Sequence, residues 1–244
     1  MSDPKSKKSP YEAERAARQA AALRENLKRR KQQARERAAA PRDGAVDLQA
    51  RAAALRDFWF GIAGGPEYGR PRKIWFEKNA EFDEELCRRF LADHERAASG
   101  ACDPLAETPE GAVALVLLLD QLPRNLFRCT PRAFATDAQA RAVAKRAVDA
   151  GFDRQVPPVE RVFLYLPFEH SESLEDQRRS LALFESLPVT PEFPASDRDL
   201  TIAYARRHLE IIERFGRFPH RNAALGRAST PEELAFLQEP NSSF

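Results

Sequence analysis

The sequence predicts an all-α protein: a tetratricopeptide-like bundle of antiparallel helix pairs, preceded by a basic N-terminal arm. Apolar residues recur at spacings of three and four almost throughout the chain after Val46. Short turns with proline or glycine separate these stretches, and no strand-like alternation lasts beyond a few residues. Because no strict repeat of about 34 residues is visible, the likeness to tetratricopeptide arrays is expected in structure and not in sequence.

Apolar stripes predict where the helices lie. The first helix is expected to bury Leu48, Ala52, Leu55, Trp59 and Ile62. The second stripe contains Phe82, Leu86, Phe90 and His94. The run from Ala112 to Leu119 has no polar face, which is typical of a central, buried helix. Later helices are expected before Gly151, after Pro157-Pro158, around Leu174 to Phe184, and from Leu200 to Phe215.

Capping signals mark several helix ends. Thr108 and Thr230 each precede a proline, the pattern of an N-cap followed by proline at the first helical position. Ser196 with Asp199 has the spacing of a capping box. Gly216 is expected in the left-handed conformation just past a helix C-terminus.

Charge divides the chain into two predicted regions, an arm at residues 1–44 and a single helical domain at residues 45–244. The arm has 13 basic and 6 acidic residues, a net charge of +7, and the rest has 26 basic and 31 acidic residues, a net of −5. The arm is predicted to be helical or disordered, since its apolar residues are mostly alanine. Either it is a solvated helix, or it contacts nucleic acid or an anionic surface through Lys28 to Lys31.

Composition bounds the function classes. The three cysteines, Cys87, Cys102 and Cys129, form no CxxC pair, which favours reduced thiols in a cytoplasmic protein. The longest apolar run, Ala112 to Leu119, is far shorter than the roughly 20 residues of a membrane-spanning helix. We find no GxGxxG, P-loop or GxSxG motif, and so expect no cofactor.

Polar residues collect around the end of the most apolar helix. Asp120 is expected to be buried there, and a buried carboxylate needs a partner. Arg124, Asn125 and Arg128 follow at spacings that would let them meet Asp120 as Pro123 bends the chain. The alternatives are a structural ion-pair network and a ligand site.

Two further segments contribute histidines. His170 and Glu172 lie in FEHSE at a junction between helices, where the helix ends do not explain the histidine. His208 lies on an apolar stripe with Tyr204, Ile211 and Phe215, as either a hydrogen-bonded core histidine or a pocket wall opposite His170.

The stretch RFGRFPHRN supplies the most cations. Arg214 lies in a last helical turn, where it complements the helix dipole. His220, Arg221 and Asn222 follow Pro219 in the first turn of a new helix, where basic groups oppose the dipole unless an anion neutralises them. That anion is a carboxylate of Asp120, Glu169 or Glu172, or a ligand. A metal site from His170, Glu172, His208 and His220 has no recognised metal spacing, so we predict no metal.

At these residues the sequence resembles the domain of unknown function 924 family of bacteria. The matching segments are FWFG, WFEKNAEFD, LLDQLPRNLFR, AFATD, FLYLPFEHSE, the His208 helix, FGRFPHRN, LGR and STPEEL. The resemblance covers about residues 50–238. It implies a tetratricopeptide-like helical bundle and no particular reaction.

Together these observations predict a site for a small anionic ligand. If the chain is an enzyme, His170 or His220 is the expected proton-transfer group. The expected ligand-binding residues are Asp120, Arg124, Asn125, Arg128, Glu172, His208, Arg214, Arg217, Arg221 and Asn222. The alternative is a tetratricopeptide-like scaffold for a protein partner, in which the polar cluster is structural.

Overall fold

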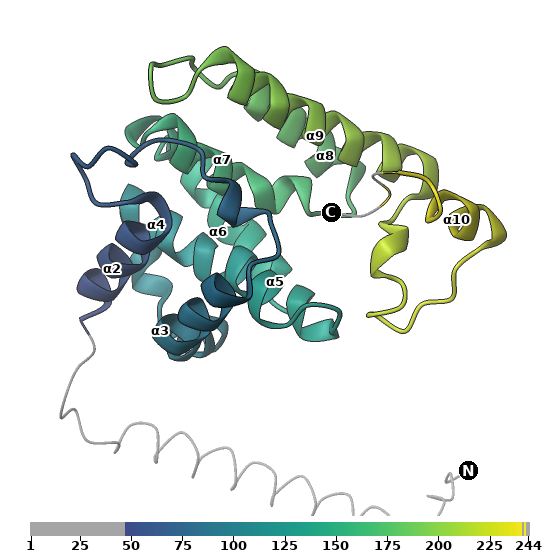
Figure 1. Ribbon diagram of the computed structural model, residues 1–244, viewed down its shortest axis with the longest axis horizontal. Coiled ribbons are helices and arrows are strands. Elements are labelled where there is room, and N and C mark those ends of the chain that lie inside the picture. The colour runs from purple at the N-terminus through teal and green to yellow at the C-terminus, as the bar shows by residue number, and fades with distance from the viewer. Residues whose placement is uncertain (1–46, 241, 243–244) are drawn as a thin grey trace, which may run out of the picture. The chain divides into compact units, whose positions relative to one another are not determined.

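Helices account for the regular structure of this chain, as a computed structural model of residues 47–240 and 242 describes it (Figure 1). The α-helices are α2 (Leu48–Phe60), α3 (Ala80–Ala98), α4 (Pro109–Val116), α5 (Leu122–Leu126), α6 (Asp137–Asp149), α7 (Pro158–Glu169), α8 (Leu174–Glu185), α9 (Ala195–Phe215) and α10 (Pro231–Phe236). No strand occurs within this described part, so the predicted all-α class is confirmed. The predictions made for the arm at residues 1–44 fall outside it.

The central helix is the apolar segment that the sequence predicts. Thr108 accepts a hydrogen bond from the Gly111 N–H, Pro109 is the first residue of α4, and residues 111–122 are all buried. α2, α6 and α7 all pack against α4, so its lack of a polar face follows from its position. In the part of the chain that is described, no helix is long and apolar enough to cross a membrane.

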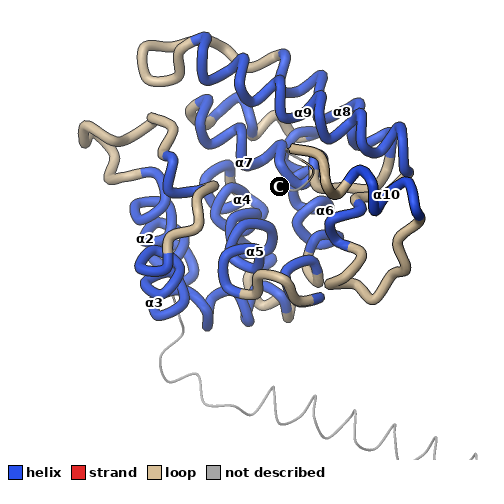
Figure 2. The backbone as a smooth tube through the Cα atoms, turned by 45° about the vertical axis from the view of Figure 1, so that its right-hand side comes forward, coloured by secondary structure: helices blue, strands red, loops and turns tan. Residues whose placement is uncertain are grey.

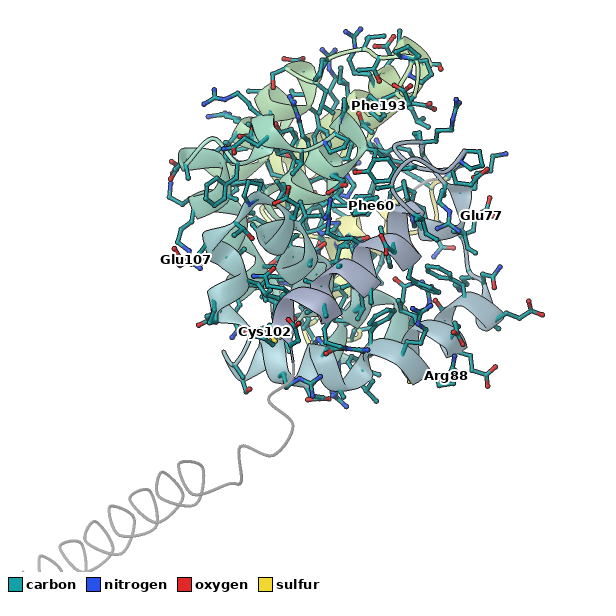
Figure 3. All side chains as sticks on the ribbon, turned by 90° about the vertical axis from the view of Figure 1, so that its left-hand side faces the viewer. Phe60, Glu77, Arg88, Cys102, Glu107 and Phe193 are labelled. Carbon is teal, nitrogen blue, oxygen red and sulfur yellow. The ribbon has the colours of Figure 1, made fainter. Side chains whose placement is uncertain are left out.

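Aromatic side chains fill the core between α2, α3 and α7. Trp59, Phe60 and Phe163 have no exposed surface, and the rings of Trp75 and Phe163 meet edge to face at 5.0 Å. Figure 3 shows Phe60 among the packed side chains and Arg88 at the periphery. Edge-to-face pairs of this kind add stability beyond the apolar area that they bury.

α8 and α9 form an antiparallel pair at one edge of the helices (Figure 2). The ion pair of Arg206 with Glu185 joins the middle of α9 to the end of α8. The pair of Glu213 with Arg178 joins the end of α9 to the start of α8. The two helices therefore run in opposite directions.

Two local predictions are wrong. Ile62 lies beyond the end of α2 and is 71% exposed, because Gly61, with φ of +89°, ends the helix first. The capping box at Ser196 is absent, because α9 already begins at Ala195 after Pro194 and has no side-chain cap. The capping box at Thr230 and the left-handed Gly216 are present as predicted.

Candidate functional site

Asp120 lies in a π-helical turn, Leu117–Gln121, that connects α4 to α5. The carboxylate has no exposed surface and accepts hydrogen bonds from His170 Nδ1 at 2.8 Å and Gln121 Nε2 at 2.5 Å. Arg124 Nη1 is 3.2 Å away. Burial alone would raise the pKa of this carboxyl, but Arg124 and His170 outweigh burial and hold it well below its usual range. Asp120 is therefore an ionised, buried carboxylate.

His170 is oriented by Asp120. It is the residue that follows the end of α7, and its side chain is 13% exposed. Because an ionised carboxylate only accepts hydrogen bonds, His170 donates from Nδ1 and keeps the lone pair on Nε2. Burial and the charge of Arg124 lower the pKa of His170 despite the neighbouring Asp120. The imidazole is thus neutral at neutral pH and can accept a proton at Nε2.

Two arginines share one carboxylate, Asp137 at the start of α6. Arg124 takes it with two hydrogen bonds of 3.0 Å, and it also donates to the backbone carbonyl of Asp120 at 2.6 Å. Arg221 reaches Asp137 only at 3.4 Å, from Nη1, which also donates to the His170 carbonyl at 3.0 Å. Arg221 is therefore the more weakly paired of the two.

The guanidinium of Arg221 is buried between two aromatic rings. Its carbon lies 4.9 Å from the centre of the Phe134 ring and 4.4 Å from that of Phe218, and the residue is 6% exposed. Its buried Nε has no hydrogen-bond partner among the described residues. Burial, and then the charge of Arg124, lower the pKa of Arg221 to about 10. Both observations indicate a cation without a full counter-charge.

The side chains of His208 and Glu169 lie next to each other, close to His170. His208 donates from Nδ1 to the Tyr204 carbonyl at 2.9 Å, and Glu169 Oε1 lies 3.4 Å from the same nitrogen. Burial, with the charges of His170 and Arg221, lowers the pKa of His208 to about 3. Burial and the nearby Asp120 raise the pKa of Glu169 to about 8. At neutral pH the imidazole is therefore neutral and the carboxyl is protonated.

His220 completes the set of imidazoles. Its ring centre is 5.6 Å from that of Phe218, and the ring centre of His208 is 5.5 Å from the same phenylalanine. Burial, and then the charges of Arg221 and His170, lower the pKa of His220 to about 3. His170, His208 and His220, which the sequence predicts as site residues, thus gather around Phe218 and Arg221.

Glu172 provides the negative partner that the sequence predicts for the segment RFGRFPHRN. Its carboxylate accepts the Phe218 N–H at 2.8 Å and two hydrogen bonds from Arg227 at 2.7 and 2.9 Å. Burial would raise the pKa of Glu172, but Arg227 and the Phe218 N–H lower it. The helix predicted after Pro219 is only a 3-10 turn, Pro219–Arg221. The negative partner of this segment is Glu172, whereas Arg221 binds Asp137, which was not among the predicted carboxylates.

Four predicted residues lie apart from this cluster. Asn125 and Arg128 do not meet Asp120; both bind Asp83 of α3, at 2.7 Å and 3.0 Å. α3 packs against α5, so Asn125 meets Asp83 across that contact, and Arg128 already lies beyond the end of α5. Arg214 faces Glu239 at 3.8 Å, and Arg217 binds Glu233 at 2.6 Å.

A second polar cluster surrounds Glu233. This carboxylate of α10 accepts from Arg217, from the Thr230 N–H at 2.8 Å and from Asn222 Nδ2 at 3.2 Å. The hydrogen bond from Arg217 lowers the pKa of Glu233 to about 2 in spite of burial. Asn222 therefore fixes α10 to the turn after α9, and its predicted role as a ligand residue stays a prediction.

Asp83, Asp137 and Arg227 are hydrogen-bond partners of the predicted residues that were not themselves predicted from the sequence. Each of them is the last residue of a segment that carries the family resemblance: Asp137 of AFATD, Asp83 of WFEKNAEFD and Arg227 of LGR. The available signal was a charged residue at the end of a segment that carries the resemblance. Within residues 47–240 and 242, no three His, Cys, Asp or Glu side chains are grouped so as to hold a metal ion.

The fold and the site define an all-α protein with a buried cluster of histidine, arginine and carboxylate side chains beside α7. The chain belongs to the family of bacterial proteins of unknown function DUF924, which matches residues 55–241 and confirms the resemblance. The structure of a protein of unknown function, ATU0120 from Agrobacterium tumefaciens, is 42% identical, with a TM-score of 0.68. The match covers 79% of this chain and 99% of that one. No curated protein matches the chain.

Proposed function

We propose that this protein binds a small anion beside Arg221 and that His170, oriented by Asp120, exchanges a proton at that site. The observation that carries the proposal is the incompletely paired guanidinium of Arg221. It is buried, its Nε has no partner among the described residues, and its nearest carboxylate, Asp137, is held more tightly by Arg124. A buried cation of this kind is stabilised by an added negative charge.

The titrating groups around Arg221 support a positive potential at the site. The pKa values of His170, His208 and His220 are all lowered, by burial first and with the charge of Arg221 among the causes each time. An anion near Arg221 would oppose that charge and raise the pKa of each imidazole. Binding is therefore expected to draw a proton onto the site, and this coupling is the basis of the proposed proton exchange.

The oriented pair of Asp120 and His170 supplies the acid–base chemistry. A carboxylate that binds Nδ1–H fixes the tautomer and stabilises the imidazolium that forms when Nε2 takes a proton. Glu169, protonated at neutral pH, stands nearby as a proton source. The arrangement fits general acid–base catalysis on an anionic substrate, and equally the uptake of a proton with a bound anion.

Paired arginine variants test the proposal. Thermal shift and isothermal titration with phosphate, sulfate and mono- and dicarboxylates would be measured on the wild type, Arg221→Met and Arg217→Met. Arg217 is the matched control, because it also binds a buried carboxylate but lies in the Glu233 cluster. We expect an anion that stabilises the wild type and Arg217→Met but not Arg221→Met. Equal binding by all three proteins, or no anion that binds the wild type, would contradict the proposal.

A scaffold for protein–protein interaction is the second candidate. The antiparallel pair of α8 and α9 is compatible with a tetratricopeptide-like arrangement, and a shallow, open surface lies on α9. In that function the His170 cluster only supports the fold. Arg221→Met would then lower the melting temperature and leave the binding of every tested anion unchanged.

A further inference from the structure

The outer face of α9 is less polar than the end of a helical stack usually is. α9 packs mainly on α8 and lies at the edge of the helices in both views (Figures 1 and 2). Its buried residues, Ala205, His208, Ile211 and Ile212, lie in the C-terminal half. Terminal helices of stacked repeats carry a polar outer face to stay soluble. The N-terminal half of α9 does not follow that rule.

An apolar stripe runs along this outer face. Leu200 is 56% exposed and Tyr204 is 52% exposed, and the exposed Ala203 lies between them. Residues three and four apart share one side of a helix, so the three side chains form a continuous patch. Beside this patch, on the same helix, Asp199, Ile202, Ala203 and Arg206 line a shallow and open stretch of surface.

We propose that this face joins two copies of the chain, with α9 packed antiparallel against α9 of the second copy about a two-fold axis near Ile202 and Ala203. In a two-fold interface each residue of one copy meets its complement on the other. Reversal about that axis brings Asp199 of each copy opposite Arg206 of the other. It also brings the side of α9 that carries Leu200 and Tyr204 in one copy toward the same side of α9 in the other copy.

The charges of the patch favour a second copy as the occupant. The acidic residues Asp197 and Asp199 lie at one end of the stripe, and Arg206 and Arg207 lie at the other. An antiparallel copy therefore pairs unlike charges at both ends, whereas a parallel one opposes like charges. The present partners of these groups, Arg198 for Asp199 and Glu185 for Arg206, are exposed ion pairs. Such pairs contribute little to stability, so exchanging partners on association costs little.

Charge reversal gives a test that a loss of folding cannot imitate. Sedimentation of the wild type over a concentration series is expected to show a monomer–dimer equilibrium. Asp199→Arg and Arg206→Asp should each weaken the dimer by roughly tenfold or more, because like charges then face each other twice. An equimolar mixture of the two variants should recover the dimer, since every facing pair again has opposite charges. Tyr204→Glu should weaken the dimer and gain nothing from mixing.

Arg88→Asp on α3 is the matched control. Arg88 is an exposed helical arginine with one carboxylate partner, Glu85, as Arg206 has Glu185. This variant should sediment like the wild type. A wild type that stays monomeric at the highest concentration overturns the proposal. A mixture of Asp199→Arg and Arg206→Asp that is no more dimeric than its components also overturns it.

Discussion

The two buried glutamates of α7 lie at opposite ends of the helix and have different partners. Glu160 lies in the first turn of the helix and Glu169 is its last residue. Glu160 has no exposed surface and receives hydrogen bonds from Arg56 at 2.9 and 3.1 Å and from Tyr68 at 3.2 Å. Glu169 is almost as buried, at 4% exposed, and among the described residues its ion-pair partner is His208 and not an arginine.

The helix ends account for part of this difference. The partial positive charge of a helix N-terminus stabilises a carboxylate, and the negative C-terminus destabilises one. Glu160 therefore combines a favourable end with an arginine, which is the arrangement of a structural ion pair. Glu169 combines an unfavourable end with burial and with Asp120 nearby, which together keep it protonated. Only the arrangement at Glu169 leaves a proton on the carboxyl group that can be transferred.

Removing the glutamate at the favourable end should have the largest effect. Glu160→Gln leaves the guanidinium of Arg56 without its carboxylate in a mostly buried position. Breaking a buried pair on one side costs about 3–5 kcal/mol, and chemical denaturation would measure the loss. A loss below about 1 kcal/mol would show that Glu160 is not the structural member of the comparison.

Glu169→Gln should act through pH. The pKa of Glu169 is raised from its usual 4.5 to about 8, so between these values the unfolded chain releases a proton that the native protein keeps. Stability must then fall as pH rises from about 4.5 to about 8, by up to about 1.4 kcal/mol per pH unit. Glu169→Gln should lack this slope, so the free energy of unfolding of the wild type should fall relative to that of Glu169→Gln between these pH values, as denaturation at several pH values would show. If the free energy of unfolding depended on pH in the same way in both proteins, the raised pKa of Glu169 would be contradicted.

His208 should give the opposite slope on the acid side. Its pKa is lowered from 6.5 to about 3, so as pH falls below 6.5 the unfolded chain takes up a proton before the native protein does. Stability is therefore lost as pH falls through this range. His208→Asn keeps an amide donor for the Tyr204 carbonyl but does not titrate. Denaturation at several pH values should show that the stability of this variant depends less on pH between about 6.5 and 3 than that of the wild type. The same dependence in both proteins would refute the prediction.

Tyr68→Phe should have the smallest effect. The variant removes the hydrogen bond of 3.2 Å from the hydroxyl to Glu160 and leaves the three hydrogen bonds from Arg56 in place. We expect a loss of about 1 kcal/mol, the usual value for one hydrogen bond, with no change in pH dependence. A loss as large as that of Glu160→Gln would mean that the tyrosine, and not the arginine, holds the carboxylate.

Much of the fold follows from local sequence signals. The periodicity of α3 and the apolar run of α4 predict which residues are buried, and Thr108, Thr230 and Gly216 predict helix ends. These signals succeed because propensity, capping and burial agree there. At Ser196 the pattern of a capping box competes with Pro194, and the helix begins at the proline instead.

Part of the site could be predicted from the sequence, but most of its pairs could not. Asp120 contacts Arg124, as the spacing predicts, and it also contacts His170. Asn125 and Arg128 bind Asp83 of α3, and hydrophobic spacing does not reveal such a contact between two helices. The sharing of Asp137 by two arginines depends on contacts between α5, α6 and the turn after α9, which no local pattern encodes.

A carbon-13 NMR titration of the Glu169 side-chain carboxyl tests the central claim most directly. The claim is that the C-terminal end of α7 holds a protonated, poised carboxyl beside the pair of Asp120 and His170. We predict that the Glu169 resonance, assigned with Glu169→Gln, titrates with a pKa of about 8. A titration near 4.5 would show an ordinary ionised carboxylate and would contradict the account.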